Sequence, residues 1–331
     1  MEKTFRSFAE QAMHYFQRDH DEIVRKPLAV PAAWQGVEMV RRDDWVVRLD
    51  AADLAALERA SAGAADRGKS LGTLTRADFV LPVLARRIEQ WRRELDDGRG
   101  FVLLRGLPVE RWGDERSSLV FWGLGLHLGI PGGQNPQEEL LGHVVDTGEE
   151  ATNPAVRRYR TAGDIAYHCD LADVVGLLCL RSGRSGGASR IVSSVAVYNE
   201  LVSRRPDLVE RLYEPFLLDA RDESRAGMPP YFPVPPCRAA GGRLRTFYHS
   251  DYFRSVVRHP DVPPFSTLER ELLDTYEEIA RSPELYLDMQ FEPGDVQLLS
   301  NHVILHARTA YEDWPEPERK RHLLRLWLSF S

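Results

Sequence analysis

A histidine and an aspartate stand two positions apart, as His168 and Asp170 in the run Tyr167-His168-Cys169-Asp170. On a β-strand these side chains would share one face, whereas a helix would separate them by about 200°. An imidazole and a carboxylate on one strand face can supply two ligands to a single metal ion. A second histidine from a distant strand would complete the two-histidine, one-carboxylate site of non-haem iron(II) oxygenases. The alternative is a surface turn or a hydrogen-bonded core histidine, because this pair occurs by chance in many proteins.

His306 is the candidate for the second histidine. It lies far beyond His168 in the chain, as two ligands on opposing strands of a barrel would. His302 is a rival, because positions 302 and 306 share a face on a regular strand. Either imidazole could instead be a hydrogen-bonded core residue, so spacing alone leaves the choice open.

Two arginines share one face of the last predicted strand, while leucines occupy its other face. They are Arg321 and Arg325. Buried arginines are costly unless they are paired with anions, and the guanidinium group suits bidentate recognition of a carboxylate. An ordinary salt bridge is the alternative. Beside a metal site, a bound dicarboxylate or an acidic substrate is the better candidate for the anion.

Further residues could line such a site. Ser189 follows Gly186-Gly187, where glycines allow a close backbone approach and the serine hydroxyl could bind a carboxylate, although a simple turn is the alternative. Arg308 would share a face with His306 and could position an anion or form a salt bridge. The candidates for the outer wall are Tyr167, Gln134 and Asn135. Each has a structural alternative, a core aromatic for the tyrosine and turn residues for the other two.

The predicted elements are mainly strands, with helices flanking them. Helices are expected over 50–60, 79–95, 117–128, 195–213 (interrupted at Pro206) and 267–281, and strands over 100–106, 173–180, 244–248, 286–291, 295–300 and 322–330. Residues 292–294 predict a hairpin turn between two of these strands. Residues 1–35 are expected to form an irregular arm, and residues 228–242 a long loop of the kind that often serves as a lid. Many short strands favour an antiparallel barrel or sandwich.

Composition narrows the class of protein. The chain has 331 residues, 43% of them hydrophobic, so it can bury a sizeable core. Its net charge of −7 gives no support for nucleic-acid binding, and no apolar run approaches the ~20 residues of a membrane span. The three cysteines match no disulfide framework or zinc motif, and the N-terminus lacks a signal-peptide core. We therefore expect a cytoplasmic protein with neither a membrane nor a nucleic-acid partner.

Together these runs resemble the taurine dioxygenase (TauD/TfdA) family of iron(II)- and 2-oxoglutarate-dependent dioxygenases, to which clavaminate synthase is also similar. The resemblance rests on the order and spacing of segments 98–108, 167–170, 186–189, 293–295, 301–308 and 321–325. It covers the chain from about residue 75 to the end. It implies an α+β fold, mainly β with flanking helices, around a double-stranded β-helix (jelly-roll) core. Residues 1–331 would form one domain, with 1–75 as an N-terminal arm and helical extension.

The resemblance also implies the iron ligands. They would be His168, Asp170 and His306, and His306 is favoured over His302 because the family's ligand stands just before Ala307-Arg308. In related halogenases a small residue replaces the carboxylate ligand. Because the aspartate is present here, halogenation is not expected.

The remaining roles concern anions. Arg321 and Ser189 fall where the family binds the distal carboxylate of 2-oxoglutarate, with serine in place of the usual threonine and its hydroxyl kept. Arg325 falls where taurine dioxygenase-like enzymes hold an acidic group of the substrate.

The expected activity is therefore the oxidation, with hydroxylation as the default, of a small acidic molecule such as an amino acid or a specialised metabolite. The enzyme would use iron(II), 2-oxoglutarate and O₂, and a homodimer is the expectation because two-fold assemblies are common. Two other functions remain. A cupin-like metal enzyme that does not use 2-oxoglutarate is disfavoured by Arg321 and Ser189. A non-catalytic metal-binding protein is disfavoured by the complete ligand set.

Overall fold

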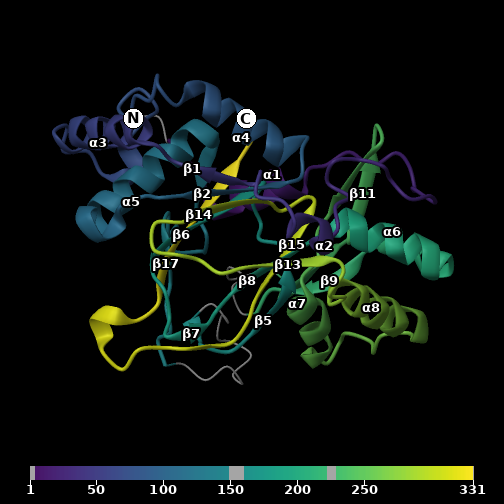
Figure 1. The fold of residues 1–331 in the computed structure, drawn as a ribbon. Coiled ribbons are helices and arrows are strands. Elements are labelled where there is room, and N and C mark those ends of the chain that lie inside the picture. The colour runs from purple at the N-terminus through teal and green to yellow at the C-terminus, as the bar shows by residue number, and fades with distance from the viewer. Residues whose placement is uncertain (1–3, 149–159, 222–228, 331) are drawn as a thin grey trace.

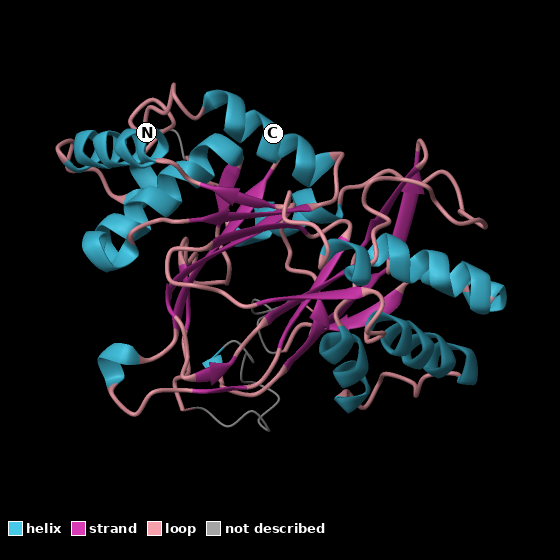
Figure 2. Ribbon diagram, viewed as in Figure 1, coloured by secondary structure: helices cyan, strands magenta, loops and turns pink. Residues whose placement is uncertain are grey.

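Most strands of the computed structural model form two sheets that face each other (Figure 1 and Figure 2). The structure describes residues 4–148, 160–221 and 229–330. The larger sheet has the order β1-β2-β14-β6-β17-β3, with β4 also paired to β17, and the smaller has the order β13-β8-β15-β5. The strands of the larger sheet are β1 (Val46–Arg48), β2 (Phe101–Arg105), β3 (Ile130–Gly132), β4 (Gly142–Val144), β6 (Val174–Arg181), β14 (Val296–Ser300) and β17 (His322–Ser329). Those of the smaller sheet are β5 (Ile165–His168), β8 (Ser189–Ser193), β13 (Tyr286–Met289) and β15 (Ile304–Arg308).

Apolar side chains from both sheets fill the space between them. Phe101 and Leu299 of the larger sheet belong to the same buried cluster as Ile191 and Leu287 of the smaller sheet. This inner core holds the two sheets together and leaves room for a site beside it. The expected mainly β fold with flanking helices is confirmed.

Helices cover the outer faces of the sheets (Figure 2). The larger sheet is covered by α4 and α5, the smaller by α6, and α8 packs on α6. The helices are α1 (Phe8–Phe16), α2 (Gly36–Met39), α3 (Ala51–Ala65), α4 (Ala85–Asp96), α5 (Val109–Leu128), α6 (Ser194–Arg204), α7 (Ser250–Ser255) and α8 (Thr267–Ala280). Among the described residues, none of the helices has the length and apolar character that crossing a membrane requires.

Most expected elements are present, with shifted ends. The helix expected from residue 79 begins at Ala85. Pro82 disfavours helical geometry at Leu81, so the residues before the proline do not extend the helix. The helix expected from residue 117 begins earlier, at Val109, and contains a kink at Gly113, where φ is 72°. Helix α6 ends at Arg204, and short 3₁₀ turns follow Pro206 as expected.

The hairpin expected at residues 292–294 is wrong. β13 pairs with β8 in the smaller sheet, whereas β14 pairs with β2 and β6 in the larger. The turn therefore carries the chain from one sheet to the other. Gly294 is required there, because its φ is +91° and an added Cβ would lie 1.9 Å from the carbonyl oxygen of Leu107. The local sequence encodes a turn but not the partners of the strands that it joins.

The expected irregular arm is also wrong over α1. Ser7 caps this helix, and Glu10 returns a hydrogen bond to the backbone of Ser7, which makes a complete capping box. The Ser-x-x-Glu signal was present in the sequence. The two faces of helix α1 contact different parts of the protein, and these contacts are described below with the site.

The long loop expected at 228–242 is wrong over the part that the structure describes, and residue 228 lies outside it. Strand β10 (Tyr231–Val234) pairs with β9 (Phe216–Asp219), and β11 (Cys237–Ala240) pairs with β12 (Arg243–Thr246). Gly241 and Gly242 have φ of +58° and +75° and turn the second hairpin. The prolines that suggested a loop lie within or beside these short strands. A further short pair joins β7 (Ser185–Gly186) to β16 (Tyr311–Glu312).

Candidate metal centre and substrate pocket

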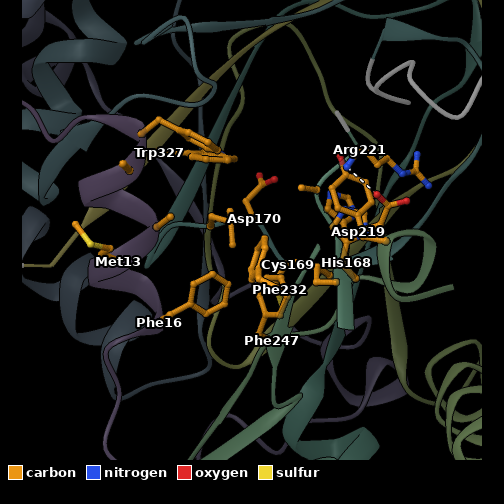
Figure 3. A pocket seen from close by; sticks show the side chains of 18 of the residues that line it. Met13, Phe16, His168, Cys169, Asp170, Asp219, Arg221, Phe232, Phe247 and Trp327 are labelled. Atoms are coloured by element: carbon orange, nitrogen blue, oxygen red, sulfur yellow. Dashed lines mark hydrogen bonds between the residues drawn. The ribbon is translucent and has the colours of Figure 1, made fainter. Parts of the chain in front are cut away.

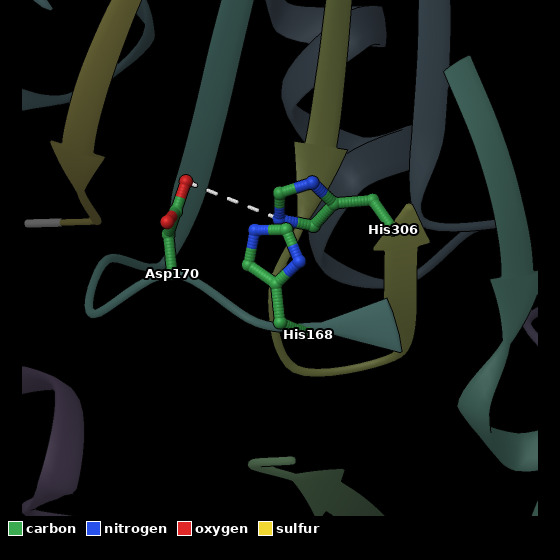
Figure 4. Close-up of side chains that lie close together, drawn as sticks. All are labelled: His168, Asp170 and His306. Carbon is green, nitrogen blue, oxygen red and sulfur yellow. Dashed lines mark ion pairs between the residues drawn. The ribbon is translucent and has the colours of Figure 1, made fainter. Parts of the chain in front are cut away.

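His168, Asp170 and His306 converge on one point (Figure 4). His168 ends β5 and His306 lies within β15, and the antiparallel register places these two residues opposite each other. One ligand atom from each of the three side chains lies within 4.8 Å of the other two. The imidazole rings are 4.1 Å apart, and His306 Nε2 lies 3.9 Å from Asp170 Oδ2. The structure therefore gathers the three residues that the sequence singled out.

Asp170 does not share the strand of His168, because β5 ends at His168. Its position is set instead by the backbone that follows the strand. The N–H of Asp170 donates to Asn301 Oδ1 (3.0 Å), and the N–H of Cys169 donates to the carbonyl of Tyr248 (2.7 Å). Asn301 thus fixes the approach of the carboxylate, a role that the sequence gave no signal for.

Charge and hydrogen bonding suit these groups to a divalent cation. Burial would raise the pKa of Asp170, but the charge of Arg325 holds it below its usual value. Burial and the nearby His168 lower the pKa of His306 to about 3, so this imidazole is neutral. His168 Nδ1 lies 2.9 Å from the carbonyl of Ala166, which leaves Nε2 for a metal. Asp170 Oδ2 and His306 Nε2 are buried without a hydrogen bond to any described residue. These unpartnered atoms are the donor set that iron(II) takes.

Two buried arginines lie close together at a second position. Arg308 and Arg321 are 6% and 5% exposed, and the ring of Tyr311 lies 4.8 and 4.9 Å from their guanidinium carbons. Arg308 donates to the carbonyls of Thr161 and Gly163, but neither arginine pairs with a carboxylate of the described residues. Burial lowers the pKa of both, that of Arg308 to about 10, with the other arginine's charge acting in the same direction on Arg308. Two buried cations without a carboxylate partner favour an anionic ligand.

Ser189 lies beside this pair. It stands opposite Arg308 in the register of β8 with β15, and its hydroxyl donates to Gln297 Oε1 (3.0 Å). Gly187 packs on Arg321, because an added Cβ would lie 3.2 Å from Arg321 Nε. The glycine therefore admits the arginine rather than a ligand. The Ser189 hydroxyl is thus on the strand position opposite Arg308, and Arg321 contacts the glycine two residues before the serine.

Arg325 lies next to the metal ligands. It is 8% exposed, and its Nη1 lies 3.5 Å from Asp170 Oδ1. Gln134 holds it from behind, because Gln134 Oε1 accepts from Arg325 Nε (2.7 Å) and Gln134 Nε2 donates to the Arg325 carbonyl (2.8 Å). Gln134 is thus a support of the arginine and does not itself line the cavity described below.

Tyr167 and Asn135 are not brought to the site. Tyr167 is 4% exposed and packs in the core on the outer side of the smaller sheet, as strand alternation requires. Asn135 forms a turn, since its side chain accepts from the N–H groups of Gln137 and Glu139. Both follow the structural alternative that the sequence left open.

His302, the rival ligand, lies in a separate polar cluster. Its Nε2 is 2.7 Å from Asp173 Oδ1. Asp173 also pairs with His14 and Arg18 and accepts from the N–H of Phe330. The turn between β14 and β15 breaks the strand, so positions 302 and 306 do not share a face.

This cluster predicts a loss of stability in mild acid. Burial lowers the pKa of His302 to about 4, although Asp173 opposes the shift, whereas an unfolded histidine titrates near 6.5. The folded state therefore binds this proton more weakly, and its stability should fall as the pH drops from about 6.5 to about 4, by at most about 1.4 kcal/mol per pH unit. Urea unfolding of the metal-free protein across this range measures the slope.

Other buried histidines contribute to the slope of the wild type, so a variant isolates the contribution of His302. We expect His302→Gln to flatten the dependence, since glutamine can still donate to Asp173 without titrating. Val80→Gln, at an exposed position that carries no titratable group, should keep the wild-type slope. Equal slopes for His302→Gln and the wild type would contradict the assignment.

A cavity of about 690 Å³ opens onto the metal ligands (Figure 3). His168, Asp170 and Arg325 lie on its polar side. Helix α1 forms another wall, which the sequence interpretation missed entirely. The other lining residues used below are Leu171, Leu218, Phe232, Phe247 and Trp327.

Comparisons with known proteins agree with this geometry. The chain matches the sequence model of the family described as "Taurine catabolism dioxygenase TauD, TfdA family" over residues 66–327. It is 31% identical over 317 residues to the FR-33289 synthase of Streptomyces rubellomurinus, covering 93% of this chain and 92% of that protein. It is 29% identical over 304 residues to the taurine hydroxylase-like protein SAT17 of Stachybotrys chartarum, covering 89% of this chain and 77% of that one.

Among solved structures, the fold is similar to that of an asparagine oxygenase in complex with Fe(II), 3-hydroxyasparagine and succinate. The TM-score is 0.66 at 18% sequence identity, covering 86% of this chain and 93% of that chain. At this low identity the likeness concerns the fold.

Proposed function

Because the chain belongs to the TauD/TfdA family of iron(II)- and 2-oxoglutarate-dependent dioxygenases, we propose that His168, Asp170 and His306 hold its iron. The observation that carries this proposal is the convergence of three buried ligand atoms, two of them without a hydrogen bond among the described residues. When bound, iron with 2-oxoglutarate and O₂ supplies the oxidising chemistry. The protein holds two imidazoles and an ionised carboxylate ready at one point.

Arg321 and Ser189 are proposed to bind the distal carboxylate of 2-oxoglutarate. The support is a buried guanidinium group with no carboxylate partner among the described residues, next to a buried hydroxyl. Arg308 lies close enough to Arg321 to lower the energy of a dianion there. Bidentate pairing with a guanidinium would fix the orientation of the cosubstrate as well as its affinity.

Arg325 is proposed to hold an acidic group of the substrate, which the enzyme hydroxylates. Gln134 fixes the guanidinium, and Arg325 lines the cavity beside Asp170. The names of related proteins point the same way, since taurine carries a sulfonate. A substrate anchored at this point would present its neighbouring carbon atoms to the metal centre, with water excluded by the apolar walls.

The direct test is a screen of small organic acids and amino acids for 2-oxoglutarate turnover, read as succinate and followed by mass spectrometry of the product. We expect succinate to form with Fe(II) and to rise with an acidic substrate. Bound metal with no succinate from any acid would favour the cupin-like alternative, and absence of metal binding would favour a non-catalytic protein.

Arg325→Ala should raise the KM for an acidic substrate by about 10- to 100-fold, because a charge-assisted hydrogen bond contributes about 1.5–3 kcal/mol. The KM for 2-oxoglutarate should change little. Steady-state kinetics with each substrate varied in turn measures both. Arg190→Ala is the control, since Arg190 pairs with Asp288 outside the cavity. If uncharged substrates alone are turned over, the role of Arg325 is wrong.

We also propose a single-domain, cytoplasmic, homodimeric enzyme. Its three cysteines, Cys169, Cys179 and Cys237, are free and buried, which suits a reducing compartment. Helix α1 is tied to the core through Asp173, which supports one domain. Light scattering of the purified protein would measure its oligomeric state.

A further inference from the structure

We propose that helix α1 selects the substrate, by lining the cavity with an apolar wall that receives a sizeable apolar body attached to the acidic group. The inference rests on the proposed function, in which Arg325 receives that acidic group at the metal end of the same cavity. It narrows the substrate class to amphipathic anions.

One face of α1 is apolar and turned into the cavity (Figure 3). Ala9, Ala12, Met13 and Phe16 recur at intervals of three and four residues, so they lie side by side on the helix. All four line the cavity. Met13 lines the cavity and is 57% exposed, so much of its apolar surface has no protein contact.

The facing wall is apolar as well. The Phe16 ring packs edge-on against Phe232 and Phe247, at 6.0 and 5.1 Å between centroids. Leu171 and Leu218 continue this surface. His168, Asp170 and Arg325 line the cavity away from α1, together with the charged side chains of Asp219, Arg221 and Asp251. The cavity therefore has charged groups as well as an apolar wall. Its volume falls in the range of pockets that bury drug-sized ligands, which leaves space for a body well beyond an acidic group.

The opposite face of α1 fixes the helix beside the metal ligands. Tyr15 donates to the carbonyl of Asn301 (2.8 Å), the residue whose side chain holds Asp170. His14 Nε2 lies 2.9 Å from Asp173, and Gln11 accepts from the hydroxyl of Ser329 (2.6 Å). The wall is therefore held at a set distance from the reacting position, and a preformed wall discriminates between substrates by size. The family-model match begins at residue 66, so α1 lies outside the segment by which the family is recognised.

The test uses straight-chain alkanesulfonates from ethane- to hexanesulfonate, titrated into the metal-free full-length protein and measured by calorimetry. For the wild type we expect the affinity to rise roughly fourfold for each buried methylene group. Ala12→Phe narrows the cavity beside α1. The affinity should therefore stop rising at a shorter alkyl chain than in the wild type. Met13→Gln keeps the side-chain length but adds polarity. The increase in affinity for each methylene group of the sulfonate should therefore be smaller than in the wild type.

Val80→Gln is the matched control, because Val80 is also 57% exposed and lies outside the cavity. It should leave the chain-length dependence unchanged. Met13 lies on an exposed helix face, so its variant should fold even if Ala12→Phe does not. The proposal is overturned if the wild type shows no dependence on chain length, or if Met13→Gln and every folded α1 variant keep the wild-type dependence.

Arg325→Ala separates this inference from the proposed function. It should weaken every sulfonate by the same factor and leave the gain per methylene intact. A different outcome is that Arg325→Ala binds the sulfonates as tightly as the wild type does, while the α1 variants change the affinity gained per methylene group. In that case the acid-binding role of Arg325 is wrong and the role of α1 stands. Loss of 2-oxoglutarate turnover would not affect this binding measurement.

Discussion

Asp170→Asn is expected to reduce Fe(II) binding by at least about 100-fold and 2-oxoglutarate turnover to background. Asparagine keeps the shape of the side chain but removes the negative charge that a bound divalent cation and the neighbouring Arg325 require. The buried cation would then lack its single anionic ligand. Because iron-ligand bonds provide the affinity, replacing the carboxylate has a larger effect than altering residues behind it, which cost about 10- to 100-fold.

Equilibrium dialysis with Fe(II) and a succinate assay measure these two effects separately. Asp288→Asn is the control, because Asp288 pairs with Arg190 away from the cavity. Circular dichroism establishes that the Asp170→Asn variant is folded. If the folded variant binds and turns over like the wild type, the ligand assignment is wrong.

Arg321→Ala should raise the KM for 2-oxoglutarate by about 100-fold, while the KM for the prime substrate changes little. A bidentate arginine–carboxylate pair makes two charge-assisted hydrogen bonds, each of about 1.5–3 kcal/mol, and Arg308 recovers part of the loss. Arg321 contacts Tyr311 and Gly187, not the residues that line the substrate cavity. The effect should therefore be confined to the cosubstrate.

Initial rates with 2-oxoglutarate varied at saturating prime substrate, and the reverse, measure the two KM values. Arg190→Ala is again a suitable control, as a neighbouring arginine whose side chain pairs outside the site. Ser189→Ala should act in the same direction with a smaller effect, because it removes one neutral hydroxyl. An equal rise of both KM values in Arg321→Ala would show a general disruption and contradict this role.

The sequence predicted the metal-ligating residues better than the residues that hold them in position. The spacing of His168 and Asp170 indicated a shared ligand set, although Asp170 lies beyond the strand and is placed by Asn301. Spacing could not separate His306 from His302, because the break between β14 and β15 depends on tertiary pairing. Family resemblance favoured the imidazole that the structure brings to the cluster.

Long-range pairing explains most of the errors. Strand signals located β13 and β14 well, but their partners lie in two different sheets, which a local turn cannot encode. The short strand β10 contains Pro233, and it forms because β9 supplies an edge for it. Helix α1 carried a capping signal, yet its partners, such as Asn301 and Ser329, lie at the far end of the sequence.

That separation bears on how the protein is made. Gln11 and its partner Ser329 are 318 residues apart, and Asp173 needs both His14 and the N–H of Phe330 to complete its hydrogen bonds. During translation α1 leaves the ribosome long before strand β17 does. It cannot form its contacts with the C-terminal residues until the rest of the chain has been synthesised. The pocket wall is therefore expected to close last, and nascent chains stalled before residue 329 should carry α1 open to protease.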